Sequence, residues 1–160
     1  GPVFYLRTDL DAPRARLIAI DTRQPQVESW RQIIPEGEDT LEMVKLVGER
    51  FAALYLHNAH HVIRLYNMDG SPDGEVELPT LGSVNTVYGP SLSGERAHRQ
   101  LFYVFSSFVH PMTVFEYDFD RRTSRAIFTP PIFPPTKPAR PSPPARTARR
   151  CPYSWCSARI

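Results

Sequence analysis

The stretch FAALYLHNAHHVIRLYNMDG, residues 51–70, has the pattern of a β-hairpin. It contains two apolar runs, Phe51 to His57 and Val62 to Met68, with a turn at Asn58 and Ala59 between them. Both runs are rich in Val, Ile, Tyr, Phe and Leu, which is typical of β-strands rather than helices. The pattern continues outward in both directions along the chain.

Similar short runs, separated by turn residues, predict a series of strands from end to end of the first 129 residues. We expect them at Val3–Thr8, Ala15–Asp21, Ser29–Pro35, Leu41–Val47, Phe51–His57, Val62–Met68, Gly74–Pro79, Gly82–Tyr88, Leu101–Ser107, Thr113–Asp118 and Ser124–Thr129. A helix over Asp39–Val47 is the one competitor, because Leu41, Val44 and Val47 would then share a face. Its length is marginal for an isolated helix.

An internal repeat organises these strands. Three segments end an apolar strand with an acid, at Asp21, Asp69 and Asp118, and these acids stand 48 and 49 residues apart. Each is followed by a second strand that closes on proline, at Pro35, Pro79 and Pro130. A four-stranded unit repeated at this period predicts an all-β chain, a partial β-propeller of about three four-stranded blades. A sandwich of unrelated hairpins is the alternative.

Charge and proline content divide the chain. The net charge is +2, yet residues 130–160 hold six of the 19 cations, none of the 17 acids and nine of the 17 prolines. Proline has no N–H donor and a fixed φ, so this segment cannot form regular helix or sheet. We therefore expect a partial propeller over 1–133 and a disordered, basic, Pro-rich tail over 134–160.

The tail has two functional interpretations, both weak. Its Pro-rich motifs resemble polyproline II ligands for SH3-type grooves. Its cations would attract phosphates, but they lack the interleaved aromatic residues of a nucleic-acid platform, so we expect no nucleic-acid partner.

Apolar runs such as Phe51 to Leu56 are far shorter than the roughly 20 residues that cross a bilayer, so we expect no membrane partner. The chain begins with Gly1 and Pro2 and shows no signal peptide, which indicates an N-terminus that has been cut or processed. We expect a cytoplasmic protein, with the periplasm as the alternative.

Five ordered motifs resemble those of the prolyl oligopeptidases, over roughly residues 3 to 133. They are Asp11–Arg14, Trp30–Glu36, Tyr55–Ala59, Val76–Pro79 with Gly82–Val84, and Phe102–Phe108 with Pro111. The resemblance implies about the last three blades of the seven-bladed N-terminal propeller of these serine peptidases. In that family the propeller caps and filters access to an α/β-hydrolase domain, whose Ser, Asp and His triad cleaves short peptides after proline.

The hydrolase domain is not in this sequence, so no family catalytic residue can be transferred to it. We expect a piece of a serine-type endopeptidase that is inactive alone and meets peptide substrate only within the complete enzyme. The alternative is a free-standing propeller-type binding module that holds a partner with its Pro-rich tail and has no catalysis.

The tail departs from the family pattern, which would continue through a segment reading SKDGT into an apolar strand. If GC-rich codons encode Lys137 to Ile160, reading from the last base of the Lys137 codon gives ARQAFATSKDGTPVPIFLVFGPD, which resembles the family. We hypothesise that the tail is translated out of frame from between about Pro134 and Lys137.

We predict no catalytic, cofactor-binding or metal-binding residue. The usual serine elbow is Gly-x-Ser-x-Gly. The segment Gly89–Gly94 misses this pattern by one residue and is interpreted as a hairpin turn. Cys151 and Cys156 would need two further ligands to hold zinc, and a disulfide between them would be incidental.

The remaining clusters also have plain structural interpretations. His57, His60 and His61 are expected to be solvated in a hairpin, and Glu36, Glu38 and Asp39 to form a solvated acidic turn. The aromatic residues with strand spacing are expected to form the core between blades; they are Phe102, Tyr103, Phe105, Phe108, Phe115 and Tyr117.

Overall fold

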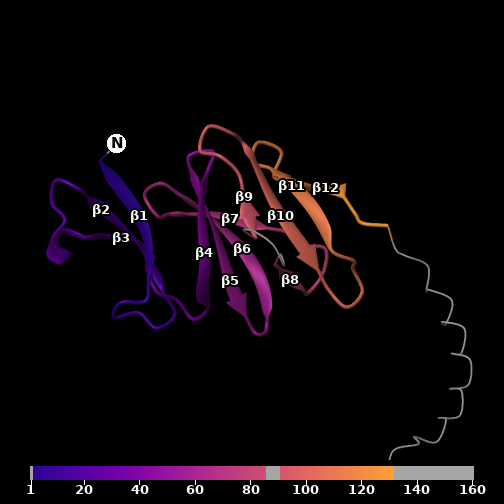
Figure 1. The fold of residues 1–160 in the computed structure, drawn as a ribbon, viewed down its shortest axis with the longest axis horizontal. Coiled ribbons are helices and arrows are strands. Elements are labelled where there is room, and N and C mark those ends of the chain that lie inside the picture. The colour runs from indigo at the N-terminus through magenta and orange to yellow at the C-terminus, as the bar shows by residue number, and fades with distance from the viewer. Residues whose placement is uncertain (1, 86–90, 132–160) are drawn as a thin grey trace, which may run out of the picture. The chain divides into compact units, whose positions relative to one another are not determined.

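Antiparallel β-sheet makes up nearly all the regular structure in the computed structural model, which describes residues 2–85 and 91–131 (Figure 1). Residues 1–130 form one compact unit that holds three sheets. Within the described residues, no helix is long and apolar enough to cross a membrane. The predicted tail, 134–160, lies outside the described residues.

The first sheet has the strand order β1-β2-β3. Its strands are β1 (Val3–Thr8), β2 (Arg16–Asp21) and β3 (Arg31–Ile34). One turn of 3₁₀ helix, η1 (Val27–Ser29), precedes β3, so the strand predicted from Ser29 begins two residues later than expected.

The second sheet has the order β4-β5-β6-β7. Its strands are β4 (Thr40–Val47), β5 (Arg50–His57), β6 (His60–Asn67) and β7 (Pro72–Val76). Residues 40–47 form a strand and not the competing helix, because β4 pairs along its length with β5 and so buries Leu41 and Val47 completely.

The third sheet has the order β12-β11-β10-β8, with β9 also paired to β10. Its strands are β8 (Ser83–Val84), β9 (Leu92–Ser93), β10 (Gln100–Ser106), β11 (Thr113–Asp118) and β12 (Thr123–Phe128). The expected strand Gly82–Tyr88 is thus shorter, and its residues 86–88 lie outside the described residues.

The sequence pattern predicted a hairpin turn at Gly89–Gly94. In the described part of this segment the prediction was wrong, because Leu92 and Ser93 form strand β9. Leu92 pairs with Tyr103, while Val84 of β8 pairs with Phe105 farther along the same edge of β10. The two short strands β8 and β9 therefore pair with the same edge of β10 and together take the place of one strand. Leu92 is fully buried, and this burial holds the second piece against the sheet.

Strand β5 lies at the centre of the packing. Its residues Phe51, Ala53 and Tyr55 belong to a core cluster shared with the first sheet. Ala52 and Leu54, on the opposite face, belong to a cluster shared with the third sheet. A strand buried on both faces is continuously apolar rather than alternating, which explains the run FAALYL.

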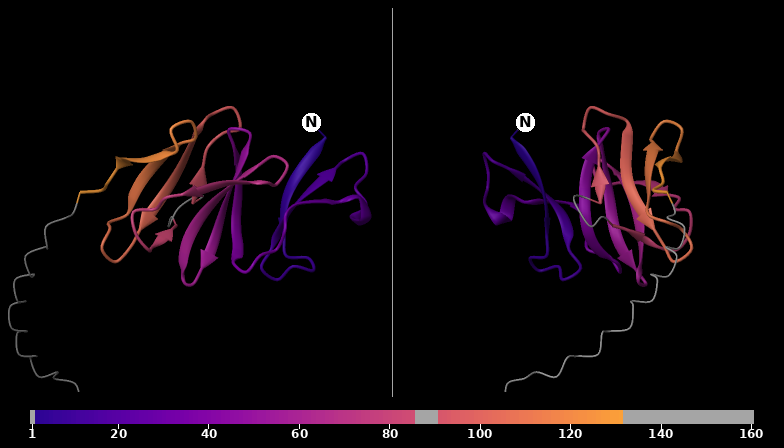
Figure 2. Two further views of the ribbon diagram at one scale, coloured as in Figure 1. Left: turned by 180° about the vertical axis from the view of Figure 1, so that it is seen from behind. Right: turned by 45° about the vertical axis from the view of Figure 1, so that its right-hand side comes forward.

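The three sheets follow one another along the chain and pack face to face (Figures 1 and 2). Their order of strands and their stacking are those of propeller blades, one with three strand positions and two with four. The prediction of a partial β-propeller of about three blades is confirmed.

Candidate functional site

An ion-pair cluster joins the second and third sheets. The carboxylate of Asp73, on β7, accepts hydrogen bonds from Arg50 Nε at 2.7 Å and from an Arg122 nitrogen at 2.8 Å. Arg122 also donates to the Asp73 main-chain carbonyl, and Arg50 lies over the Phe119 ring. Burial acts to raise the pKa of Asp73, but the hydrogen bonds from Arg122 and Arg50 outweigh it and lower that pKa.

Replacing Asp73 with asparagine is expected to lower the free energy of unfolding by about 1.5 to 2 kcal/mol, because two charge-assisted hydrogen bonds weaken and both cations are partly exposed. Urea denaturation at pH 7 measures the change. Asp120→Asn is the control, since the Asp120–Arg99 pair lies on the surface. An equal loss of stability in both variants would contradict the conclusion that the Asp73 ion pairs stabilise the fold more than a surface pair does.

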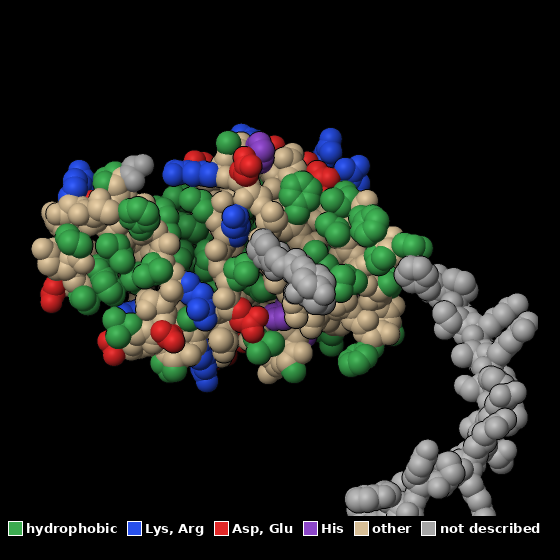
Figure 3. Space-filling model, viewed as in Figure 1, with side chains coloured by type: hydrophobic (Ala, Val, Ile, Leu, Met, Phe, Trp, Pro, Cys, Tyr) green, Lys and Arg blue, Asp and Glu red, His purple; other side chains and the backbone are tan. Residues whose placement is uncertain are grey.

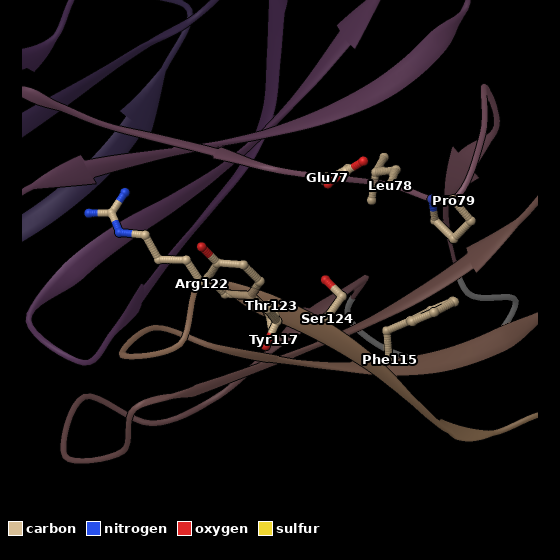
Figure 4. Close-up of a pocket in the computed structure, with 8 residues that line it drawn as sticks. All are labelled: Glu77, Leu78, Pro79, Phe115, Tyr117, Arg122, Thr123 and Ser124. Carbon is tan, nitrogen blue, oxygen red and sulfur yellow. The ribbon is translucent and has the colours of Figure 1, made fainter.

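Next to this cluster lies a groove of about 350 Å³. Figure 4 shows Glu77, Leu78 and Pro79, on the segment after β7, facing side chains of β11 and β12. The hydroxyl of Ser124 accepts a hydrogen bond from the buried Tyr103 hydroxyl at 2.9 Å. Serine attack needs an adjacent imidazole base, and no histidine is among the described residues that line this groove, so these residues cannot perform that chemistry.

The histidines of the β5–β6 hairpin contact separate carboxylates. His57 Nδ1 lies 2.7 Å from Asp39, and His61 Nε2 lies 2.8 Å from Glu42. The Val84 N–H donates to His61 Nδ1 at 3.0 Å. Because an amide N–H only donates, Nδ1 is the acceptor and Nε2 carries the proton that His61 donates to Glu42.

The prediction of solvated imidazoles was therefore wrong for His61, whose side chain is 11% exposed. His61 instead joins β6 to β8 across two neighbouring sheets. Among the described residues, no group of three His, Cys, Asp or Glu side chains could hold a metal ion.

The acidic turn is solvated only in part. Glu36 and Glu38 are exposed, and Glu36 accepts a hydrogen bond from the Arg14 main-chain N–H. The prediction was wrong for Asp39, because its side chain is mostly buried between His57 and Arg64. Burial acts to raise the pKa of Asp39, and hydrogen bonds from these two residues lower it overall.

Both Asp39 and Asp73 have a pKa below the ordinary Asp value of 3.8. A carboxyl whose pKa is lowered by folding stabilises the protein fully above its unfolded pKa, and this contribution is lost as the pH falls through the folded value. We expect a constant urea midpoint from about pH 7 to 5 and a steep fall below about pH 4. A weaker fall in Asp73→Asn would confirm the source, whereas an unchanged profile would contradict it.

Most of the predicted aromatic core is confirmed. Tyr103, Phe105, Phe115 and Tyr117 are buried between the second and third sheets. Two residues are exceptions. Phe102 is only half-buried, on the opposite face of β10 from Tyr103. Phe108 is fully exposed at the β10–β11 turn, because it lies beyond the last paired residue of β10. Cys151 and Cys156 lie outside the described residues.

The stacked sheets define the class, a β-propeller domain. The family model described as "Prolyl oligopeptidase, N-terminal beta-propeller domain" matches residues 1–129. This chain belongs to that family.

Known relatives agree with this assignment. The chain is 29% identical over 132 residues to a prolyl endopeptidase of Elizabethkingia meningoseptica. The aligned segment covers 82% of this chain and 18% of that protein. It is 32% identical over 121 residues to the dual function macrocyclase-peptidase POPB of Galerina marginata, covering 74% of this chain and 16% of that protein.

Solved structures give the same result. One comes from a study of two prolyl endopeptidases and their inter-domain dynamics; it matches with a TM-score of 0.72 and 30% identity, over 79% of this chain and 18% of that chain. Ligand-free prolyl oligopeptidase B of Galerina marginata matches with a TM-score of 0.68 and 26% identity, over 81% and 18%. The chain thus spans less than a fifth of the length of these relatives.

Proposed function

We propose that this chain supplies part of the propeller of a serine-type endopeptidase that hydrolyses short peptides after proline. The observation that carries the proposal is the family match over residues 1–129. The sequence holds no Gly-x-Ser-x-Gly elbow, so the Ser, Asp and His triad would stand on a separate α/β-hydrolase domain. The propeller would cap that domain and filter access to its active site, and this chain alone would not cleave peptides.

Exposed apolar side chains on the first sheet support a larger assembly. Phe4 and Leu6, which share one face of β1, are both exposed, and Figure 3 shows hydrophobic side chains gathered over this sheet. Propeller sheets bury their faces against neighbouring blades in rings of about four to eight. We infer that further blades cover this surface in the complete protein.

A chimera tests the function. Residues 1–129 would replace the matching segment of the Elizabethkingia meningoseptica prolyl endopeptidase, and cleavage of a Gly-Pro fluorogenic substrate would be measured. We expect activity within about tenfold of the parent enzyme, because the catalytic groups are untouched and only remote positioning changes. The isolated chain should show none.

Two controls accompany it. The parent enzyme without the segment should be inactive, and a long protein chain such as casein should not be cleaved by the chimera. A chimera that is monodisperse yet inactive, or that degrades casein, would contradict the proposal.

We further infer that the tail from residue 134 is an out-of-frame translation and serves no partner, so the sole partners are the hydrolase domain and peptide substrate, with no nucleic acid and no membrane. The cytoplasm is the proposed compartment, and fractionation of the source cells tests it. Recovery in a periplasmic fraction would contradict that assignment.

A further inference from the structure

A second pocket, the hairpin-end pocket, lies where three turns of two neighbouring sheets meet. It measures about 430 Å³ and is lined by the β5–β6 turn, the segment before β8 and the start of the β10–β11 turn. It shares no described residue with the groove of Figure 4. Its walls include the apolar side chains of Leu81 and Phe108 and the polar side chains of Asn58 and His60.

The backbone around this pocket is held in place. The His61 N–H donates to the Gly82 carbonyl at 2.9 Å, and the Val84 N–H donates to the His61 ring. A Cβ on Gly82 would lie 2.5 Å from the Ser106 carbonyl oxygen, so glycine is required for this close approach. The backbone along this side of the pocket is therefore fixed before a ligand binds, which reduces the entropy lost on binding.

The turn residues themselves adopt an unusual conformation. Asn58 and Ala59 both have positive φ, 43° and 64°. This is the geometry of a type I′ turn, in which alanine is disfavoured. It places Asn58, Ala59 and His60 along one side of the pocket.

The lining selects an uncharged ligand. Among the described residues, no Lys, Arg, Asp or Glu lines the pocket, whereas three serines and Asn58 provide hydroxyl and amide groups. Leu81 and Phe108 are exposed, by 71% and 111% of their reference areas. Large exposed apolar side chains beside polar groups are typical of binding sites. A phosphate or carboxylate ligand would meet no Lys or Arg side chain among these described lining residues.

We propose that the hairpin-end pocket binds an uncharged peptide segment, with an aliphatic or proline side chain held between Leu81 and Phe108. The serine hydroxyls and the Asn58 amide would hydrogen-bond the peptide main chain, which offers both donors and acceptors. The proposal rests on the proposed function, since the peptide would be substrate reaching the enzyme through its propeller. The pocket would thus be a peptide contact remote from the catalytic triad.

Fluorescence anisotropy on the 160-residue chain tests the proposal, with a fluorescein-labelled twelve-residue peptide of Gly, Ala, Pro and Leu as the probe. We expect Phe108→Ala to weaken binding about tenfold, since losing an aromatic anchor commonly has at least this effect. Phe108 is fully exposed, so its truncation leaves the fold intact, as circular dichroism would verify. Leu81→Ala should weaken binding in the same direction.

Phe128→Ala is the matched control, because Phe128 is an exposed aromatic residue on β12 that does not line the pocket. It should bind the probe within about twofold of the parent. Absence of binding by the parent chain below about 1 mM probe, or equal effects of Phe108→Ala and Phe128→Ala, would overturn the proposal.

The two proposals fail separately. The binding assay needs no hydrolase domain, so an active chimera whose chain binds no probe would overturn the pocket alone. An inactive chimera whose chain still binds the probe through Phe108 would overturn the peptidase function alone.

Discussion

Replacing Phe105 with alanine is expected to lower the free energy of unfolding by about 3 to 5 kcal/mol, the usual range for a large aromatic residue removed from a core. Phe105 has no exposed surface. Its ring lies 5.6 Å from the His110 ring and 6.4 Å from the Phe115 ring, both in edge-to-face geometry. The alanine variant would leave a cavity between the second and third sheets. Urea denaturation at pH 7 measures the loss.

Phe128→Ala again serves as the control, because Phe128 is 59% exposed on the outermost strand. Its effect should stay within about 0.5 kcal/mol. If Phe105→Ala were equally mild, Phe105 would not lie between two packed sheets, and the face assigned to β10 would be wrong.

Gly70→Ala is expected to lower the free energy of unfolding by about 2 to 4 kcal/mol, combining left-handed strain with overpacking. Gly70 has a φ of +90° in the β6–β7 turn, and a Cβ there would lie 2.0 Å from the Ile33 carbonyl oxygen of the first sheet. The substitution would push the first and second sheets apart. Thermal unfolding followed by circular dichroism measures the effect.

Gly37→Ala provides the comparison, because a Cβ at Gly37 meets nothing within 4 Å. We expect a change within about 0.5 kcal/mol for this variant. Should Gly70→Ala prove as stable as Gly37→Ala, the close contact between the β6–β7 turn and β3 would not exist in solution.

The sequence pattern predicted the strands well because period and turn chemistry are local signals. Apolar runs with intervening turn residues identified the β4–β5–β6 hairpins, and the acidic repeat identified the blade period. One of the two shortest strands escaped prediction. β9 has only Leu92 and Ser93, too few to show alternation, and it is a strand only because β10 offers an edge for it to pair with.

Contacts between sheets were not predictable from sequence alone. Arg50, Asp73 and Arg122 are far apart in the chain, and nothing in their local pattern shows that they meet. The burial of Asp39 and His61 depends likewise on neighbouring strands and sheets. Phe108 showed the opposite error: strand spacing suggested the core, but the strand ends at Ser106 and leaves this ring exposed.

Family membership came from the order of several motifs, whereas the candidate pocket came only from the structure. Its walls join Asn58, Leu81 and Phe108, which sequence spacing alone could not bring together. The repeat explains why Asn58 and Phe108 meet, because equivalent turns of consecutive blades lie at the same end of adjacent sheets. Leu81 joins them from the segment that connects β7 to β8.

The proposed function requires that these blades be part of a serine peptidase whose hydrolase domain is encoded beyond them. Sequencing the source DNA from the Thr129 codon through the following kilobase, read in all three frames, tests this most directly. We predict SKDGT followed by an apolar strand in a shifted frame, and a Gly-x-Ser-x-Gly elbow farther downstream. A stop codon directly after Ile160, with no such elbow in any frame, would contradict the account.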